Sequence, residues 1–208
     1  YELIYQLPST SELAFGLMLS LLRSIPKSKD HVSNYYWDYT RFLGRQVKDL
    51  NIGIVGYGRL GKMMEKFCKA FQANTYIYDP YEDVTQTSLE EMVKVCDVIS
   101  LHVHVTTETY HLINKDLLAL SNKNLYIINT SRGEIVNEKD IVEALSKGNL
   151  TGYATDVIED EFGDLTNSPI IKAMNEGENI IVTPHTGGMT VEGQTKAYKW
   201  SINKLWRY

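Results

Sequence analysis

Residues 51–61 read NIGIVGYGRLG, and the predicted architecture of the chain follows from this stretch. It opens with a short β-rich apolar run and continues into a pattern with helical spacing. Between the two, Gly56, Gly58 and Gly61 form the pattern G-x-G-x-x-G. In such a turn the first glycine allows the sharp bend, the second lets the backbone approach a pyrophosphate, and the third lets helix and strand pack closely. The stretch therefore predicts a dinucleotide-binding strand–turn–helix unit.

A second predicted strand, TYIYD, follows the helix and ends in Asp79. This acid lies roughly 20 residues beyond the first glycine, where a carboxylate hydrogen-bonds the adenosine ribose hydroxyls in such folds. A carboxylate there would also repel a 2′-phosphate, so the sequence favours NAD over NADP. Asp79 precedes Pro80 and is also a typical turn residue, which is compatible with the ribose role.

Strands and helices alternate through the rest of the chain. A helix is predicted at 138–147 and ends at Gly148, and Ser88 with Glu91 predicts the cap of a shorter helix. This alternation predicts an α/β fold of the Rossmann type, a doubly wound parallel sheet with helices on both faces. A last helix is expected from about residue 190. Further strands are predicted at 97–103, 124–129, 152–157 and 179–184.

The first fifty residues show a different pattern. Ser9 and Glu12 have the spacing of a capping box, which predicts a helix from Ser9 to Leu22 or Arg23. Residues 24–50 lose this periodicity, and we interpret them as a long connector that packs on something or carries function. The connector holds the aromatic residues Tyr35, Tyr36, Trp37, Tyr39 and Phe42.

The composition excludes several classes of protein. The chain has 208 residues, of which 43% are hydrophobic and 23% charged, which suits one globular domain over 1–208. Its net charge of −5 and the lack of a basic stripe argue against a nucleic-acid or anionic-membrane partner. The apolar run 13–22 is too short to span a membrane, so we expect a cytoplasmic protein. Cys68 and Cys96 lie in apolar patterns and are expected to be buried free thiols, with no metal site.

Several blocks of the chain resemble the D-isomer-specific 2-hydroxyacid dehydrogenase family, in family order, from about residue 9 to beyond residue 195. The resemblance implies the cofactor-binding domain of an enzyme that transfers hydride between NAD(H) and a small 2-hydroxy or 2-oxo acid. The blocks include GRQVKDLNIGIVGYGRLGK (44–62), NTSRGEIVNEKDIVEALSKG (129–148), DVIEDE (156–161) and NIIVTPHTGG (179–188).

The resemblance assigns catalytic roles to Arg132, Glu161 and His185. Arg132 would grip the substrate carboxylate, His185 would carry the hydroxyl proton, and Glu161 would orient the imidazole. Each has an ordinary alternative: a surface arginine, a solvated glutamate, a structural histidine. The trio is credible because hydride transfer from an alcohol carbon needs a proton carrier and a group that holds the acid end of the substrate.

The same matching predicts the residues that meet the cofactor. Asp156 is expected to contact the nicotinamide carboxamide, with capping or turn chemistry as the alternative, and the backbone around Arg59 to meet the pyrophosphate. The full predicted cofactor site is Gly56, Gly58, Arg59, Leu60, Gly61, Asp79, Val103, Thr130, Ser131, Asp156 and Gly187.

Two residues depart from the family pattern. His104 stands where the family commonly has a proline that lines the cleft, which frees the backbone and adds a polar group beside the cofactor. Phe162 replaces the proline that follows the catalytic glutamate, so the loop that carries Glu161 is expected to differ in placement. These changes bear on affinity and loop geometry rather than on the class of reaction.

The resemblance also implies that the substrate domain is missing or truncated, so we expect the chain alone to be inactive. Residues 24–50 match the arm through which the family's domains form a homodimer. Trp37 would reach toward the neighbour's site or, equally, belong to the core of its own subunit. The alternative function is an NAD(H)-sensing module akin to the family's co-repressor branch. A protein that binds an S-adenosyl ligand is disfavoured by the set Arg132, Glu161 and His185.

Overall fold

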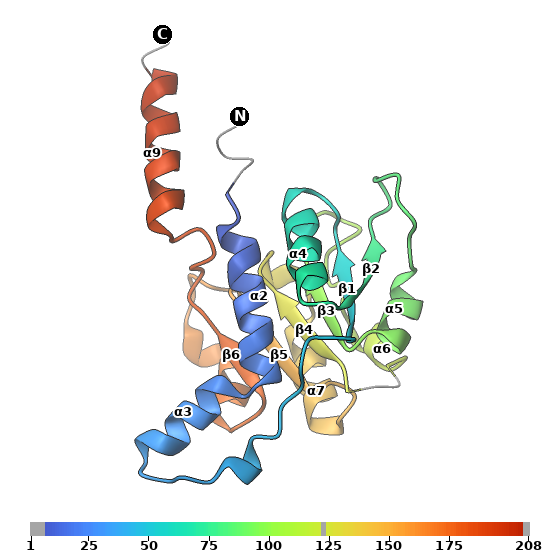
Figure 1. Cartoon of the computed structure of the whole chain (residues 1–208), viewed down its shortest axis with the longest axis vertical. Helices are drawn as coiled ribbons and strands as arrows, with labels where there is room; N and C mark the ends of the chain where they lie inside the picture. Colours follow the sequence, from blue (N-terminus) through green and yellow to red (C-terminus); the bar gives the residue numbers. More distant parts are fainter. Residues whose placement is uncertain (1–6, 122–123, 206–208) are drawn as a thin grey trace.

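The chain folds around one parallel β-sheet. The computed structural model describes residues 7–121 and 124–205, and Figure 1 shows the sheet between two layers of helices. The strands lie in the order β2-β1-β3-β4-β5-β6, and each neighbouring pair is parallel. The predicted doubly wound α/β class is therefore confirmed. The strands are β1 (Asn51–Val55), β2 (Asn74–Tyr78), β3 (Val98–Leu101), β4 (Tyr126–Asn129), β5 (Gly152–Thr155) and β6 (Ile180–Val182).

Each face of the sheet buries its own hydrophobic cluster, because successive strand residues point to opposite faces. Ile52 and Ile54 belong to the cluster under α2 (Ser9–Leu22) and α4 (Arg59–Ala70), and Cys68 lies in this layer. Ile99 and Ile127 belong to the other cluster, which also holds Cys96; both cysteines are buried and neither is in a disulfide. The helices on this second face are α5 (Leu89–Val95), α6 (Lys115–Leu118), α7 (Glu138–Lys147) and α8 (Pro169–Asn175).

The strand order reverses between β1 and β3, which places a switch point in the middle of the sheet. Ligands of open α/β sheets bind at such a point, outside the carboxyl ends of the strands. All six strands are parallel, so the loops that follow β1, β3, β4, β5 and β6 emerge at this same edge. The fold thus gathers the predicted site loops on one side of the sheet.

The helix predicted near the start is confirmed as α2, but its predicted capping box is wrong. The residue that precedes the helix is Pro8, and no side chain caps it. Ser9 is buried inside the first turn, and its hydroxyl lies 2.9 Å from the hydroxyl of Thr190, in the loop before α9 (Val191–Leu205). The Ser9 hydroxyl therefore bonds to Thr190, a residue far away in the sequence, instead of capping its own helix. The cap predicted for α5 is correct, since Ser88 Oγ accepts the Glu91 N–H at 3.2 Å.

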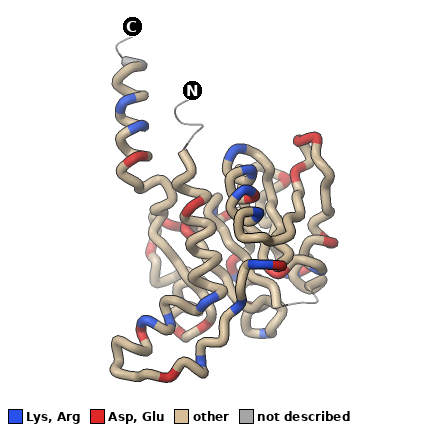
Figure 2. Tube along the Cα trace, in the orientation of Figure 1, with Lys and Arg blue, Asp and Glu red and all other residues tan. Residues whose placement is uncertain are grey.

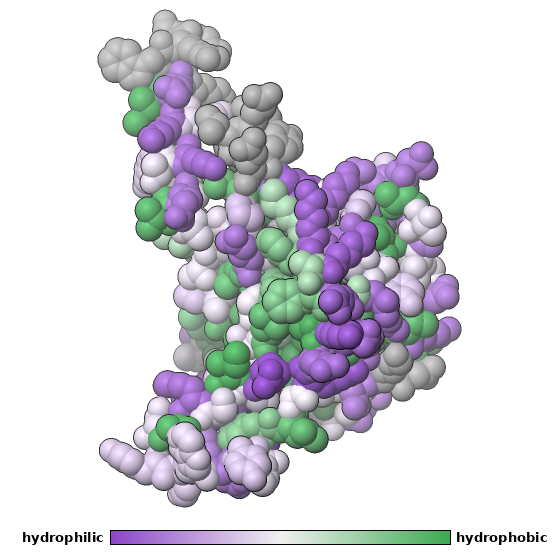
Figure 3. Space-filling model, in the orientation of Figure 1, coloured by the Kyte–Doolittle hydropathy of each residue, from purple (hydrophilic) through white to green (hydrophobic). Residues whose placement is uncertain are grey.

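Residues 24–50 are more regular than predicted. They contain α3 (Ile25–Ser33), in which no residue is buried, and a short 3₁₀ turn, η1 (Tyr39–Arg41). Tyr35 is 99% exposed and Trp37 is 86% exposed, so Trp37 does not belong to the core of its own subunit. Figure 3 shows this segment as a lobe of pale, large side chains at the lower end of the molecule.

Three further observations concern the surface charges, helix α9 and the length of the helices. Figure 2 shows basic and acidic residues interspersed along the trace. Helix α9 extends away from the sheet at the opposite end from α3 (Figure 1). Within residues 7–121 and 124–205, no helix combines the length and the apolar composition that a membrane crossing requires.

Candidate functional site

A cavity of about 590 Å³ opens at the carboxyl edge of the sheet. Its wall combines residues from α2, the start of α4, the loops after β3 to β6, and α9. Segments far apart in the sequence therefore meet around one space, as expected at a switch point. The lining residues are Thr10, Gly58, Arg59, Leu60, His102, Val103, His104, Thr130, Ser131, Arg132, Asp156, His185, Gly187, Gly188 and Trp200.

The three glycines of the turn have different surroundings. Gly56 has φ of 90°, and a Cβ there would lie 2.5 Å from the carbonyl oxygen of His102. A Cβ on Gly61 would lie 2.0 Å from the carbonyl oxygen of Gly56, so the helix packs directly on the turn. At Gly58 no atom lies within 4 Å of the position of a Cβ. This open approach at the lip of the cavity fits a pyrophosphate that nears the backbone.

The first turn of α4 supplies the matching electrostatics. Arg59 and Leu60 line the cavity at the amino end of this helix, where free N–H groups and the helix dipole favour an anion. The guanidinium of Arg59 donates to the carbonyl oxygen of Leu7 at 2.5 Å. Its side chain is thus engaged with Leu7, and the contact of the backbone here with a phosphate stays a prediction.

Asp79 braces the glycine turn from the end of β2. Its carboxylate accepts the N–H of Tyr57 at 2.7 Å and the N–H of Tyr81 at 3.0 Å. It lies outside the residues that line the cavity. Each carboxylate oxygen can accept more than one hydrogen bond, so the ribose role stays a prediction beside this structural one.

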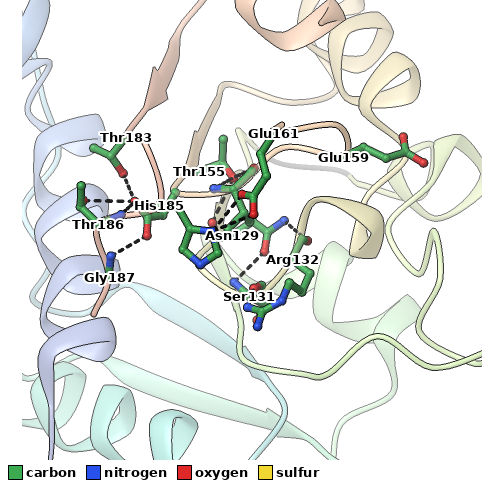
Figure 4. Close-up of polar contacts among 12 residues, drawn as sticks. Asn129, Ser131, Arg132, Thr155, Glu159, Glu161, Thr183, His185, Thr186 and Gly187 are labelled. Carbon is green, nitrogen blue, oxygen red and sulfur yellow. Dashed lines mark hydrogen bonds and ion pairs between the residues drawn. The ribbon is translucent and has the colours of Figure 1, made fainter. Parts of the chain in front are cut away.

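His185 and Glu161 form a hydrogen-bonded pair. Nδ1 of His185 lies 2.9 Å from both carboxylate oxygens of Glu161. An ionised carboxylate only accepts, so Nδ1 carries the proton and Nε2 is the nitrogen left for another partner. Figure 4 shows Glu161 directed at the imidazole from the loop after β5. The structure thus brings two of the three predicted catalytic residues into contact.

Glu161 reaches His185 from behind the main cavity. It lines a second, smaller cavity of about 330 Å³, whose wall also includes His185. Phe162, the residue that departs from the family pattern, lines this space too, and its side chain is 95% exposed. His185 and Asp156 thus line both cavities, whereas Glu161 lines only the smaller one.

Arg132 stands at the end of β4, on the main cavity with His185. The side-chain amide of Asn129 donates to the carbonyl oxygen of Arg132 at 2.8 Å, which fixes the backbone of the turn. The guanidinium is exposed and donates to the neighbouring carbonyl oxygen of Ser131 at 2.6 Å. In Figure 4 the guanidinium and the imidazole of His185 face the same part of the site. A permanent cation and an imidazole thus line one cavity.

Asp156 organises the loop that carries His185. It is 2% exposed, and its carboxylate accepts the N–H groups of Thr186 at 2.8 Å and Gly187 at 2.7 Å. It also accepts the hydroxyl of Thr183 at 2.5 Å. The turn alternative predicted for Asp156 is thus present, and because Asp156 also lines the cavity, its contact with nicotinamide stays a prediction.

The loops after β3 and β4 bring buried polar groups to the wall of the cavity. Val103, Thr130 and Ser131 lie there as predicted, and Ser131 Oγ donates to the carbonyl oxygen of Leu101 at 2.8 Å. The hydroxyl of Thr130 and Nδ1 of His102 are buried without a hydrogen-bond partner. Burial lowers the pKa of His102 from 6.5 to about 4, so its imidazole is neutral at physiological pH.

Sequence reasoning missed Thr10, His102, Gly188 and Trp200 as lining residues. Thr10 and Trp200 come from the first and last described helices, and no local motif marks them. His102 and Gly188 each adjoin a predicted residue, which was the available signal. His104 does line the cavity, as its place in the pattern suggested. Among the described residues, no group of three or more His, Cys, Asp or Glu side chains could hold a metal ion.

Known proteins share this sequence and fold. Residues 15–187 match the model of the NAD-binding domain of D-isomer specific 2-hydroxyacid dehydrogenases. The chain is 36% identical over 198 residues to D-3-phosphoglycerate dehydrogenase of Methanocaldococcus jannaschii, an alignment that covers 91% of this chain and 37% of that protein.

Solved structures agree with this similarity. D-2-hydroxyisocaproate dehydrogenase superposes with a TM-score of 0.85 at 28% identity, covering 96% of this chain and 65% of that one. D-lactate dehydrogenase from Aquifex aeolicus, solved with NAD and lactic acid, gives a TM-score of 0.83 at 28% identity, with 97% and 66% covered.

Proposed function

Since this chain belongs to the D-isomer specific 2-hydroxyacid dehydrogenase family and forms its NAD-binding domain, we propose that it serves hydride transfer between NAD(H) and a small 2-hydroxy or 2-oxo acid. The observation that carries the proposal is the 2.9 Å contact between Glu161 and His185, beside Arg132 on the cavity that the glycine turn borders. The chain spans only 37% of the phosphoglycerate dehydrogenase that it matches, so the activity is proposed for the full-length parent protein.

The cofactor would be held by backbone more than by side chains. The N–H groups at the start of α4 would bind the pyrophosphate, and Asp79 would accept the adenosine ribose hydroxyls. Val103, Thr130, Ser131, Asp156 and Gly187 would hold the nicotinamide end. When bound, NAD supplies the carbon that accepts the hydride from the alcohol.

The protein side chains would hold the substrate and move its proton. Arg132 binds the carboxylate with its planar fork, which fixes the orientation of the neighbouring carbon. His185 takes the hydroxyl proton at Nε2 while Nδ1 stays bonded to Glu161. The carboxylate stabilises the imidazolium that forms. In the reverse direction the same imidazolium returns the proton to the carbonyl oxygen.

The assembly that we propose is a cytoplasmic homodimer. Leu43 is 96% exposed, close in sequence to the exposed Tyr35 and Trp37. A large exposed apolar and aromatic surface is typical of an interface. Figure 3 shows further apolar side chains over α2 on the same face of the molecule. A second copy of the chain would cover this surface.

The test uses the full-length parent protein with NADH and a panel of 2-oxo acids. Wild type should oxidise NADH with at least one of them. Arg132→Ala should abolish turnover while NADH affinity, measured by fluorescence titration, stays within about two-fold, because the guanidinium serves the substrate. Arg132→Lys keeps the charge without the fork and should retain part of the activity. His185→Ala should lower kcat strongly.

The same test distinguishes the enzyme from the alternative function, an NAD(H)-sensing module. An NAD(H)-sensing module would bind NADH without turning over any acid in the panel. This alternative is not favoured, since the relatives described above carry the names of dehydrogenases. Near-normal kcat/KM in Arg132→Ala or His185→Ala would overturn the proposed mechanism.

A further inference from the structure

The turn that carries Arg132 touches the segment that carries Glu161. Gly133 follows Arg132 and opens η2 (Gly133–Ile135). A Cβ on Gly133 would lie 2.1 Å from the carbonyl carbon of Ile158 and 2.2 Å from the amide nitrogen of Glu159. The two backbones are therefore in direct contact, and one residue, Asp160, separates this contact from Glu161.

A buried carboxylate fastens the same contact. Glu138 is the first residue of α7 and is only 6% exposed. Its Oε1 accepts the N–H of Glu159 at 2.9 Å. Burial raises the pKa of Glu138, which marks the cost of placing a carboxyl here. An acid in the first turn of a helix usually lies in solvent, so its burial against another loop points to a positional role.

The side chain of Glu159 is fixed on the side away from the catalytic pair. Figure 4 shows the carboxylates of Glu159 and Glu161 pointing in different directions. The Glu159 carboxylate accepts the hydroxyl of Tyr110 at 3.1 Å and lies 3.3 Å from Nε2 of His111. With its N–H held by Glu138, residue 159 is held at backbone and side chain alike. Two positions along the segment, beyond Asp160, the carboxylate of Glu161 lies 2.9 Å from Nδ1 of His185.

We propose that Glu138 is a positioning residue that holds the Glu161 loop against the Arg132 turn, so that Glu161 keeps His185 oriented on the cavity. Glu138 itself touches neither the proposed cofactor site nor the substrate space, since it lies outside the lining of both cavities. The inference rests on the proposed function for its kinetic consequence, but its geometric consequence can be measured without turnover.

The kinetic test compares variants of the full-length parent protein. Glu138→Ala should lower kcat by about 10- to 100-fold, because small displacements of catalytic groups have effects of this size. The KM for NADH should change by less than about two-fold, since the glycine turn is untouched. Glu138→Gln keeps an oxygen acceptor of the same reach and should retain most of the rate.

Asp140 provides a matched control. It lies in the same turn of α7, and its Oδ2 accepts the N–H of Lys115 at 2.9 Å. It thus fastens the start of α6 by the same kind of bond, and neither Lys115 nor any other residue of α6 belongs to the proposed site. Asp140→Ala should leave kcat near wild type, which separates an effect on the Glu161 loop from a general weakening of α7.

The second readout is the ¹⁵N chemical shift of His185 Nδ1, recorded on this chain. Glu138→Ala should move this shift toward its value in Glu161→Ala, while Glu138→Gln and Asp140→Ala should not. If the circular dichroism spectrum shows that Glu138→Ala is unfolded, Glu138→Asp replaces it. Its side chain is too short to reach the Glu159 N–H, so the same change in the Nδ1 shift is expected.

The outcomes for the two proposals are separate. An unchanged Nδ1 shift with wild-type kcat in Glu138→Ala would refute the positioning role, whatever the parent enzyme does. A wild-type parent that turns over no 2-oxo acid would refute the proposed function, and the Nδ1 shift would still decide the role of Glu138. An equal loss of kcat in Asp140→Ala would also overturn the inference.

Discussion

Asp156 fixes the backbone at His185 through both its carbonyl oxygen and its carboxylate. Its carbonyl oxygen accepts the N–H of His185 at 2.9 Å, and its carboxylate accepts the N–H groups of the next two residues. His185 has φ of 54°, in the left-handed region that few residues other than glycine adopt. Such a conformation persists where the surroundings enforce it, and it is common at functional sites. The bond network of Asp156 is what holds this loop in place.

The first prediction concerns Asp156→Asn. An amide presents one oxygen and one NH₂ group, so either the three hydrogen bonds on Oδ1 or the Gly187 N–H on Oδ2 loses its acceptor. We expect a loss of about 1–3 kcal/mol in the free energy of unfolding, because a buried donor becomes unsatisfied. Urea denaturation measures it. Unchanged stability would mean that the amide has found compensating partners, contrary to the proposed role of this network.

The second prediction concerns cofactor choice. NAD(H) should bind more tightly than NADP(H) by about 1–3 kcal/mol, because the Asp79 carboxylate accepts ribose hydroxyls and repels a phosphate. Asp79→Asn should narrow this gap and still accept the N–H of Tyr57 through its amide oxygen. Isothermal titration calorimetry with both cofactors gives the difference. Equal affinities in the wild type would remove Asp79 from the cofactor site.

The third prediction concerns Gly133→Ala. The added methyl would lie 2.1 Å from the carbonyl carbon of Ile158. Because the clash is with backbone atoms, no change of side-chain rotamer can relieve it. We expect a destabilisation of about 1–3 kcal/mol or more, as for an overpacked core, together with displacement of the Glu161 loop.

Gly16→Ala is the control for this substitution. Gly16 lies inside α2, and a Cβ there meets no atom within 4 Å. The helix should gain up to about 1 kcal/mol from the better helix former. Equal effects of the two substitutions on thermal unfolding would show that the backbone contact at Gly133 is not tight.

The fourth prediction concerns the pH dependence of stability. The pKa of His102 is about 4 in the folded protein and near 6.5 when unperturbed. The unfolded chain therefore binds a proton at His102 more readily than the folded protein does. The contribution of neutral His102 to the free energy of unfolding is complete above pH 6.5 and is lost as pH falls toward 4. His102→Gln should flatten the difference between pH 7 and pH 4.5 by up to about 3 kcal/mol. An identical pH profile in the variant would contradict the buried, neutral state of His102.

The fifth prediction concerns the exposed arm. The chain should be a dimer at micromolar concentration, and Leu43→Asp should shift it to monomer by placing a charge in the interface. Phe162→Asp is the matched control, since Phe162 is 95% exposed but lies far along the chain near Glu161. Sedimentation velocity distinguishes the two states. A monomeric wild type would refute the dimer.

The strands were predictable because their signal is local. Apolar runs such as DVISLHV, the glycine turn and the cap at Ser88 each fix an element through neighbouring residues. The missed helix α3 has no buried residue, so it has no apolar stripe to detect. Helix α8 did carry a signal, Ser168 as cap followed by Pro169, which the sequence reading overlooked.

The site was predictable only in part, for a related reason. Arg132, Glu161 and His185 follow strands whose ends meet at one edge, so their convergence could be expected. Glu138 could not be identified, because an acid in a first helical turn has the same pattern whether it is solvated or buried. Ser9 misled for the same reason: its partner Thr190 is almost a whole chain away.

The placement of the two cysteines gives each helical layer its own chemical reporter. Cys68 lies within α4, Cys96 directly follows α5 on the other face of the sheet, and both are fully buried. Burial raises the pKa of Cys68 to about 12, so the reactive thiolate is scarce at neutral pH. A thiol reagent can then label either position only when its layer has separated from the sheet. Alkylation rates of Cys68→Ser and Cys96→Ser would therefore measure how often each side of the sheet opens.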